Sequence, residues 1–298
     1  MKPEDLLFRA AGPADLGAFE RIAASAGFAD RFYCYRNEMV VHTSPALNAS
    51  NRIHTLHLCH DLTGHTLLTS FYIEPAYEDT LAPQLLSRAR LLFIAEFAER
   101  FSDRIAAESQ GLYDETDGRC PFWDAVGRRF FDMDYRQVER LTGGRNKAFI
   151  AELLPQSPVY VPLLPEQAQW AIGQLHPVGE LPFSILLDEG YDTETYVDIF
   201  DGGPTVDARV AMLKTVATSR RQPLQLAPND HAELGPWQLV ANTQRQGFCA
   251  LLRRSHRPRS LVLDSASAGL FQATPGAALR AAVLQEAQVA LVTQEAQA

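Results

Sequence analysis

The chain has 298 residues, 46% of them hydrophobic and 21% charged, a composition typical of a soluble globular protein with room for one large domain and a small one. The formal net charge of -9 argues against non-specific binding to nucleic acid or to an anionic membrane surface. The start of the chain lacks the apolar stretch of a secretory signal, and the longest apolar run, residues 91–97, is interrupted by Glu96 and too short to span a bilayer. We therefore expect a cytoplasmic protein without a membrane segment.

The cysteines are far apart in the sequence. Cys34, Cys59, Cys120 and Cys249 form no CxxC pair. Disulfide frameworks and zinc sites usually show short, regular cysteine spacings in small secreted or metal-binding domains. We expect reduced thiols, mostly buried, in place of a disulfide frame or a zinc site.

The first part of the chain mixes strands and helices. Strands are expected at residues 7–10, 31–41, 53–58, 66–73 and 105–108, with a polar turn at 60–64. Gly12 and Pro13 open an amphipathic helix that runs to about residue 25, with the proline in its first turn. Apolar residues at helical spacing predict a second helix over residues 81–101.

The pattern beyond residue 108 is richer in helices. Helices fit residues 122–131, 166–175 and 183–189, and strands fit residues 148–153 and 196–200. Residues 221–236 carry proline, asparagine, aspartate and glycine without periodicity, which is typical of a linker. Strands at 239–242, 248–253, 260–263 and 279–283 would then form a small module.

The predicted fold is mixed α/β (α+β) with a small β-rich appendage. We divide the chain into a core over residues 1–220, a linker over 221–236, the β-rich module over 237–285 and a tail over 286–298.

His176 is the first candidate for chemistry. A histidine titrates near neutral pH and can act as a general acid or base. The following residue is Pro177, and a histidine in the last turn of a helix can instead interact with unpaired carbonyls there. The residues alone leave both interpretations open.

Four histidines, His54, His57, His60 and His65, lie within twelve residues and suggest a metal site. His54 and His57 differ by three positions, so on a strand they point to opposite faces. No Cys, Asp or Glu completes a ligand set by spacing, and we predict no metal.

Two carboxylates, Asp198 and Asp201, lead into the turn Gly202-Gly203-Pro204. They are candidates for binding a cationic group of a substrate, although a solvated turn is the ordinary explanation and the one we favour. Lys147 and Arg145 are candidates for contact with an acyl carboxylate, although isolated cations are usually surface groups.

Six colinear segments carry a more specific signal. They are FYCYRNEMVVH (32–42), IHTLHLCHDLTGHTLLTSFYIEP (53–75), CPFWDAVGRRFFDMDY (120–135), KAFIAELLPQSPVYVPLLPEQAQ (147–169), IGQLHP (172–177) and YVDIFDGGPT (196–205). Together they resemble the arginine N-succinyltransferase family, particularly its alpha-type subunit. The resemblance is strong over about residues 30–220 and looser over the β-rich module.

The resemblance implies an N-acetyltransferase-like (GNAT) core, with a mixed sheet flanked by helices. It implies transfer of succinyl from succinyl-CoA, as co-substrate, to the α-amine of L-arginine in arginine catabolism, with no bound cofactor. Some family members also use L-ornithine, and some assemble from two related subunits. A beta-type subunit or a second copy of the chain is therefore the implied partner.

The resemblance also assigns residues. His176 falls on the family's proton donor. Phe71 falls on the strand position that contacts succinyl-CoA, where family members carry leucine. With Ser70 and Ile73, the strand over residues 66–73 would supply backbone donors to the reacting group.

The chain departs from the family pattern in two places. Residues 74–84, EPAYEDTLAPQ, replace a basic, glycine-containing loop that would bind the CoA pyrophosphate, and they contain no Gly, Arg or Lys but three carboxylates and Pro83. The segment between the first helix and the FYCYR strand is also shorter than in the family. A non-catalytic subunit that stabilises or regulates a catalytic relative is therefore the alternative, and a shortened, functionless remnant is a third.

Overall fold

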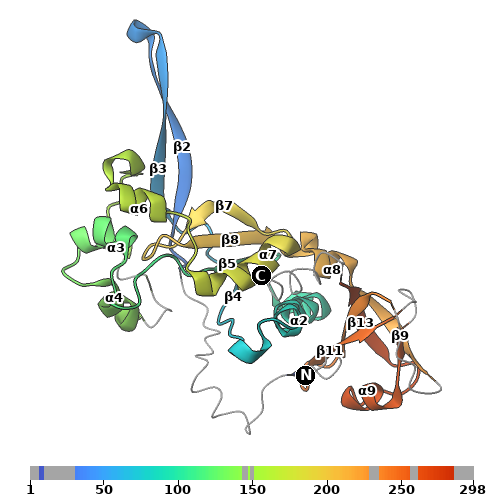
Figure 1. Ribbon diagram of the computed structural model, residues 1–298. Helices are drawn as coiled ribbons and strands as arrows, with labels where there is room; N and C mark the ends of the chain where they lie inside the picture. Colours follow the sequence, from blue (N-terminus) through green and yellow to red (C-terminus); the bar gives the residue numbers. More distant parts are fainter. Residues whose placement is uncertain are drawn as a thin grey trace.

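The computed structural model describes residues 7–9, 31–142, 147, 151–227, 235–255 and 261–284. These residues form two sheets, one of seven strands and one of six, with helices beside them (Figure 1). The mixed α/β class is thereby confirmed. The predicted helix at residues 13–25, Arg145 and the tail at 286–298 lie outside the described residues.

The seven-stranded sheet has the order β4-β5-β8-β7-β2-β3-β6. In that order its strands are β4 (Thr66–Leu68), β5 (Arg104–Glu108), β8 (Pro204–Arg209), β7 (Asp192–Val197), β2 (Cys34–Ser44), β3 (Ala49–Cys59) and β6 (Val159–Tyr160). β4 and β5 run parallel, and the other neighbours are antiparallel. β8 was not predicted, and the strand predicted over residues 66–73 ends at Leu68.

Strands β2 and β3 form a long hairpin arm that stands out from the rest of the molecule (Figure 1). They pair from Cys34 opposite Cys59 to Ser44 opposite Ala49, and a single turn over Pro45–Leu47 joins them. β2 pairs with β7 only at Tyr35 and Arg36, and β3 pairs with β6 only at Thr55 and Leu56. The outer part of the arm is therefore a two-stranded ribbon.

The six-stranded sheet has the order β1-β11-β10-β13-β9-β12. Its strands are β1 (Leu7–Arg9), β11 (Cys249–Arg254), β10 (Trp237–Ala241), β13 (Ala278–Val283), β9 (Arg220–Leu226) and β12 (Leu261–Leu263), and helix α9 (Ser265–Leu270) follows β12. The four strands predicted for the β-rich module are confirmed. The sheet also takes strands from residues 7–9 and 220–226, outside the bounds predicted for that module.

The predicted linker is corrected at its start, because its first residues lie in β9. This strand pairs with β13 on one side and β12 on the other, yet Leu224 is its one buried residue. Backbone hydrogen bonds hold a strand whose side chains are mostly polar, so the apolar alternation that predicts strands is missing.

Helix α2 (Ala82–Glu96) lies between the two sheets (Figure 1). Leu85 and Leu92 pack with Leu239 and other residues of the six-stranded sheet. Leu91 and Ile94 belong to a second cluster with residues of β5 and β8. A helix that contacts apolar surfaces on two sides is buried nearly all round. The predicted helix at 81–101 is thus confirmed in its main part, and a short turn over Ala98–Arg100 follows it.

A buried ion-pair network joins α2 to α7 (Glu180–Glu189) and α8 (Lys214–Thr218). The Arg88 side chain is fully buried and lies 2.8 Å from the Glu189 carboxylate and 2.5 Å from that of Asp188. Lys214 pairs with Asp188 at 3.0 Å, and Glu189 accepts hydrogen bonds from the backbone and hydroxyl of Thr215. The network sets the position of α7 against α2.

A third group of helices packs around Trp123. It comprises α3 (Pro121–Ala125), α4 (Tyr135–Thr142) and α6 (Glu166–Ala171). The helix predicted at 122–131 is shorter than expected and continues as a turn over Gly127–Arg129. The strand predicted at 148–153 is wrong for residues 151–153, which end a helix and form a turn, and residues 148–150 are not described. Within the described ranges, no helix is long and apolar enough to cross a membrane.

Candidate active site

The two parallel strands of the seven-stranded sheet separate at one end. Their pairing stops at Leu68 opposite Ala107, and the chain after Leu68 continues without regular structure. Ser70 adopts a left-handed backbone conformation with φ of 57°, which side-chain-bearing residues rarely take. The turn at Ser70 redirects Phe71 and Ile73 away from the sheet. Strand ends that separate in this way are common ligand sites in α/β folds.

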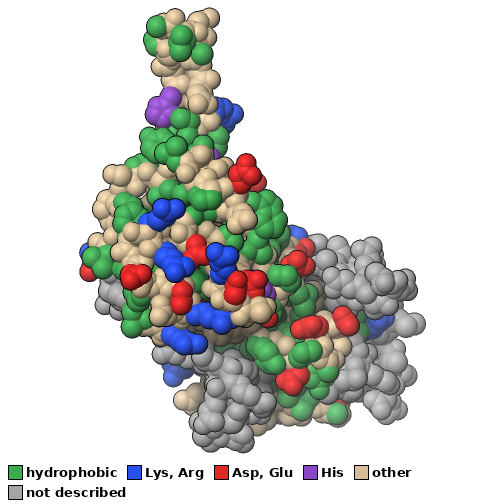
Figure 2. Space-filling view, turned by 60° about the vertical axis from the view of Figure 1, so that its left-hand side comes forward, with side chains coloured by type: hydrophobic (Ala, Val, Ile, Leu, Met, Phe, Trp, Pro, Cys, Tyr) green, Lys and Arg blue, Asp and Glu red, His purple; other side chains and the backbone are tan. Residues whose placement is uncertain are grey.

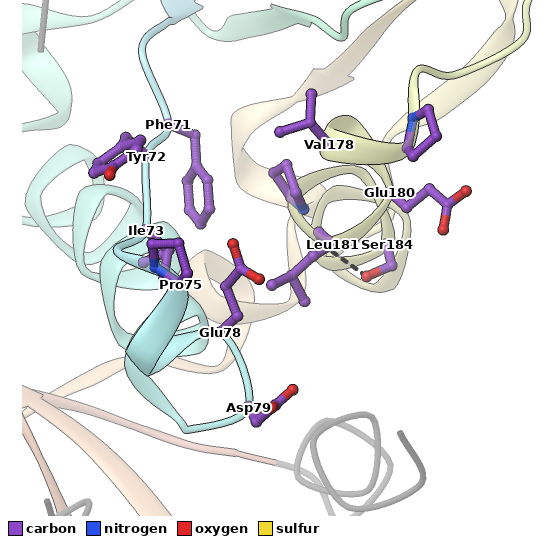
Figure 3. Close-up of a pocket in the computed structure, with 12 residues that line it drawn as sticks. Phe71, Tyr72, Ile73, Pro75, Glu78, Asp79, Val178, Glu180, Leu181 and Ser184 are labelled. Atoms are coloured by element: carbon purple, nitrogen blue, oxygen red, sulfur yellow. Dashed lines mark hydrogen bonds between the residues drawn. The ribbon is translucent and has the colours of Figure 1, made fainter. Parts of the chain in front are cut away.

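A cavity of 570 Å³ lies between this segment and the start of α7. One wall carries Phe71, Tyr72, Ile73, Pro75, Glu78 and Asp79, and the other carries Pro177, Val178, Glu180, Leu181, Pro182 and Ser184. In Figure 3, Phe71, Glu78 and Leu181 converge on the space between the two walls. The volume and the apolar lining are those of a small-molecule site. The structure thus brings Phe71 and Ile73 to the residues that directly follow His176.

His176 precedes a short turn over Pro177–Gly179 and does not end a helix, because α6 already ends at Ala171. The alternative of a helix C-terminal histidine is therefore wrong. Its backbone N–H donates to the Gln110 carbonyl at 2.9 Å, and its Nδ1 accepts from the Val178 N–H at 3.4 Å. The ring stacks on Tyr113 at 4.9 Å, and Nε2 lies 3.7 Å from a Glu115 carboxylate oxygen. With 12% exposure, the side chain is held in place but stays open to solvent.

The cavity carries negative charge. Among the described residues, its lining includes Glu78, Asp79 and Glu180 and no Lys or Arg. Within the described part of the chain, no carboxylate of the three forms an ion pair. The Arg90 guanidinium of α2 lies 5.5 Å from the Phe71 ring centre. Two of the three carboxylates in the stretch predicted to disfavour a pyrophosphate, Glu78 and Asp79, thus line the cavity.

Asp198 and Asp201 lie elsewhere, in a buried cluster at the turn between β7 and β8. Asp198 Oδ1 accepts backbone N–H groups of Phe200 and Asp201, and the other oxygen pairs with Lys147. Asp201 accepts from the backbone N–H groups of Gly111 and Gly203 at 2.9 and 2.8 Å. The structure therefore does not bring these carboxylates to the cavity wall, and a role in substrate binding stays a prediction.

Lys147 is buried and is not a surface cation. It pairs with Asp198 and with Glu108 at the end of β5. Although burial opposes ionisation, the Lys147 ammonium lowers the pKa of Asp198. Burial raises the pKa of Glu108 to about 8 despite Lys147. Burial, together with the charge of Asp198, raises the pKa of Asp201 to about 7.

The clustered histidines lie on the hairpin arm and the turn that follows it. His54 hydrogen-bonds to Asn37, whereas His57 lies 3.1 Å from the Thr55 hydroxyl and 3.4 Å from Glu38. Among the described residues, no three His, Cys, Asp or Glu side chains are arranged to hold a metal ion.

Comparison with known proteins relates this geometry to a family. The family model described as "Arginine N-succinyltransferase beta subunit" matches residues 15–215, more than half of the chain. The chain belongs to the arginine N-succinyltransferase family.

Relatives named for both subunit types are similar to the chain. Arginine N-succinyltransferase subunit alpha of Pseudomonas aeruginosa is 48% identical over 231 residues, which cover 78% of this chain and 68% of that protein. Subunit beta of the same organism is 40% identical over 266 residues, covering 88% and 77%. The arginine N-succinyltransferase of an Enterobacter species is 37% identical over 262 residues, covering 87% and 75%.

A solved structure extends the similarity to the fold. It is that of arginine/ornithine succinyltransferase subunit AI from Pseudomonas aeruginosa, with a TM-score of 0.76 and 41% identity, covering 89% of this chain and 76% of that one. This chain therefore has the acyltransferase fold of the arginine N-succinyltransferase family.

Several residues of the site were not predicted from the sequence. The second wall of the cavity, from Val178 to Ser184, contains no recognisable sequence motif. It lines the cavity because α7 packs against α2. Tyr113 was missed because a lone aromatic residue carries no signal. The contact between Lys147 and Glu108 joins residues 39 positions apart, which spacing does not reveal.

Proposed function

We propose that this chain is a subunit, of alpha type, of a cytoplasmic arginine N-succinyltransferase that transfers succinyl from succinyl-CoA to the α-amine of L-arginine. The observation that carries the proposal is the cavity, which joins Phe71 and Ile73 to Pro177 and Val178 beside His176. Family membership supplies the reaction, and the cavity supplies a place for it. On this proposal the seven-stranded sheet, with β4 and β5 separating at one end, corresponds to a GNAT-like core.

The reaction sets modest demands on acid and base groups. An α-amine has a pKa near 7.7–8.0, so about a tenth of it is the free nucleophile at pH 7 and a weak base suffices to deprotonate the rest. Attack on the thioester carbonyl places negative charge on its oxygen, which backbone N–H groups near the left-handed turn at Ser70 would stabilise. The cavity would hold the amine and the thioester in contact.

The departing CoA thiolate then needs a proton, and we assign this step to His176. Its Nδ1 accepts a hydrogen bond from Val178, so the neutral ring carries its proton on Nε2. Stacking on Tyr113 and the backbone hydrogen bond to Gln110 fix the orientation of the ring. We infer that Nε2–H donates its proton to the departing sulfur and that the proton lost by the attacking α-amine replaces it on the ring, so one proton passes from the amine to the thiolate through His176.

A direct experiment follows the product. The chain, alone and co-expressed with a related subunit, is incubated with succinyl-CoA and L-arginine, and N2-succinylarginine is measured by mass spectrometry. L-ornithine is the competing acceptor, and acetyl-CoA is the competing donor. The proposal expects arginine-dependent product from succinyl-CoA with the related subunit present. Absence of product in every combination would contradict it.

A second function is favoured by one observation: the described residues of the cavity wall include three carboxylates and no cation. Phosphates of CoA would lie close to these charges, which is unfavourable. In this alternative the chain is a non-catalytic subunit, and CoA binds to the related subunit. Product that forms in the complex but does not depend on His176 would favour this alternative.

The arm suggests where a related subunit or a second copy binds. Tyr33 and Tyr35 are buried within the chain, whereas Met39, Val41 and Leu47 are 52, 57 and 78% exposed. Figure 2 shows the arm projecting from the body, with hydrophobic side chains at its tip. An isolated two-stranded ribbon is marginally stable in water, so a partner that covers this apolar surface would stabilise it.

A further inference from the structure

Two of the four cysteines meet at the base of the arm. Cys34 begins β2 and Cys59 ends β3, and the two residues are direct partners in the antiparallel register. Their Sγ atoms lie 3.6 Å apart. Cys120 and Cys249 are also buried, and each thiol lies near a backbone carbonyl, of Phe200 and of Leu270 respectively. Spacing in the sequence gave no sign of the Cys34–Cys59 pair.

The backbone at this pair suits a disulfide. Directly opposite residues in antiparallel strands have Cα atoms about 4.5–5.5 Å apart, within the range of about 4.4–6.8 Å that disulfides span. The sulfur atoms need to approach from 3.6 Å to about 2.05 Å. Rotation of the two side chains achieves this without a change in strand pairing.

The two thiols have different surroundings. Cys34 is fully buried, whereas Cys59 is half-buried and lies near Arg36 and Asp61. A hydrogen bond from Cys34, aided by the Asp61 backbone N–H and the charge of Arg36, lowers the pKa of Cys59. The shared hydrogen bond and burial raise the pKa of Cys34. Cys59 is therefore the more reactive thiol, and Cys34 is placed to react with it second.

We propose that Cys34 and Cys59 are a reversible oxidation site, at which a hydroperoxide converts the two thiols into a disulfide. The Cys59 thiolate attacks one peroxide oxygen, the O–O bond breaks, and a sulfenic acid and hydroxide form. The Cys34 sulfur then attacks the sulfenic sulfur, the S–O bond breaks, and the hydroxyl leaves as water with the Cys34 proton. In sum, two thiols and one hydrogen peroxide give one disulfide and two waters.

The disulfide would close the whole arm into a covalent loop, because Cys34 lies at the start of β2 and Cys59, 25 positions later, at the end of β3. It would lie where β2 leaves its pairing with β7 at Tyr35 and Arg36. Oxidation would therefore tie the two strands together at the point where the arm joins the sheet, in addition to and independently of the proposed acyl transfer.

Peptide mapping tests the site without any activity measurement. The purified full chain is treated with hydrogen peroxide, blocked with iodoacetamide and digested with trypsin without reductant. Arginines at positions 31, 36, 52 and 88 release residues 32–36 with Cys34 and residues 53–88 with Cys59. We expect these two peptides as one linked species that dithiothreitol separates, and loss of two of the four thiols.

The remaining cysteines provide matched controls. Cys120→Ser and Cys249→Ser should give the same linked species in the same yield. Cys59→Ser and Cys59→Ala should give none, and Cys34→Ser should leave a sulfenic acid on Cys59 that dimedone captures. The proposal is overturned if the wild type keeps all four thiols at peroxide levels that oxidise free dithiothreitol. It is also overturned if Cys59→Ser loses two thiols as the wild type does.

Discussion

At the scale of single residues, charge is what sets this cavity apart from a phosphate-binding site. Glu78 and Asp79 come from the segment that faces α7, and Glu180 comes from α7 itself. The nearby Arg90 guanidinium lies against Phe71 and does not line the cavity. Each carboxylate adds repulsion to a bound pyrophosphate, so the chain alone should bind succinyl-CoA only weakly.

Neutralising the wall should strengthen CoA binding. Exposed charge pairs are each worth about 0.2–1 kcal/mol, so Glu78→Gln with Asp79→Asn should lower the dissociation constant for succinyl-CoA about two- to thirtyfold. Glu99→Gln with Glu166→Gln changes the net charge equally at exposed sites outside the cavity and should have little effect. Calorimetric titration of the three proteins measures this. A micromolar constant for the wild type alone would show that the phosphates bind away from these carboxylates.

Asp201 should make the unfolding free energy depend on pH. Its pKa is raised from 3.8 to about 7 in the folded protein, so the folded state binds this proton more tightly than the unfolded chain. The stabilisation is complete below the unfolded value and is lost as pH rises through about 7. Asp201→Asn removes this pH dependence. Between about pH 4 and 7 the unfolding free energy of the variant should therefore rise relative to that of the wild type, by at most about 1.4 kcal/mol per pH unit.

Urea denaturation across this pH range gives the comparison. Asp132→Asn, at an exposed carboxylate, is the control and should run parallel to the wild type. If the gap between Asp201→Asn and the wild type does not change with pH, Asp201 is ionised throughout and the account of this cluster is wrong.

At the scale of elements, the second wall of the cavity depends on α7 staying against α2. Arg88 holds the two helices together through Asp188 and Glu189, and both the Arg88 and Glu189 side chains are fully buried. Removing one partner of a buried ion pair leaves an uncompensated charge and costs about 3–5 kcal/mol. The network therefore links the stability of the fold to the shape of the cavity.

Arg88→Met should lower the unfolding free energy by that amount, about 3–5 kcal/mol. Arg128→Met removes an exposed ion pair with Asp124 four positions away and should cost less than about 0.5 kcal/mol. Adding Glu189→Gln to Arg88→Met should recover part of the loss, because the buried charge is gone. Thermal and urea unfolding decide this, and equal losses for Arg88→Met and Arg128→Met would be inconsistent with a structural role for the network.

The sequence predicts those elements whose own side chains carry the pattern. Leu85, Leu92 and Phe93 mark α2 by helical spacing, and the apolar strands β10 and β11 are evident from their burial-prone residues. β9 was missed because its neighbours and not its side chains hold it in the sheet. The strand at 66–73 was drawn too long because Ser70 carries no turn signal, although its backbone is left-handed.

The candidate site divides in the same way. Phe71, Ile73 and His176 came from resemblance, and the structure brings the segments that carry them to one cavity. Leu181 and Pro182 were not predicted, because their position depends on the packing of α7 against α2, about a hundred residues earlier in the chain. Asp198 and Asp201 are buried and accept backbone hydrogen bonds, so the interpretation as a solvated turn is wrong, and their role in substrate binding stays a prediction.

At the scale of the whole molecule, the arm is the feature that a lone chain does not explain. Its outer strands lack further partners within the described residues, and Met39, Val41 and Leu47 face solvent. The family includes relatives named for alpha and beta subunits, and we propose a related subunit as the partner that covers the arm.

Association should depend on this surface. Co-expressed with a related subunit, the chain should elute from a sizing column as one complex, with its mass given by light scattering. Val41→Glu should weaken association at least tenfold, because it places a charge in an apolar contact. Met212→Glu, at a residue 73% exposed on the body, should leave the complex intact. A stable wild-type monomer that does not bind the related subunit would refute this account of the arm.

The central claim, that the cavity beside His176 performs succinyl transfer, is tested most directly by release of the CoA thiol. The complex is assembled with wild-type chain or with His176→Asn, which keeps an oxygen that accepts from the Val178 N–H, and L-arginine is added or withheld. Loss of a proton donor typically costs about 10²–10⁴-fold in rate. We predict a fall of at least about a hundredfold in arginine-dependent thiol release, with a melting temperature close to that of the wild type. Full thiol release by the His176→Asn complex would contradict the claim and assign the chemistry to the related subunit.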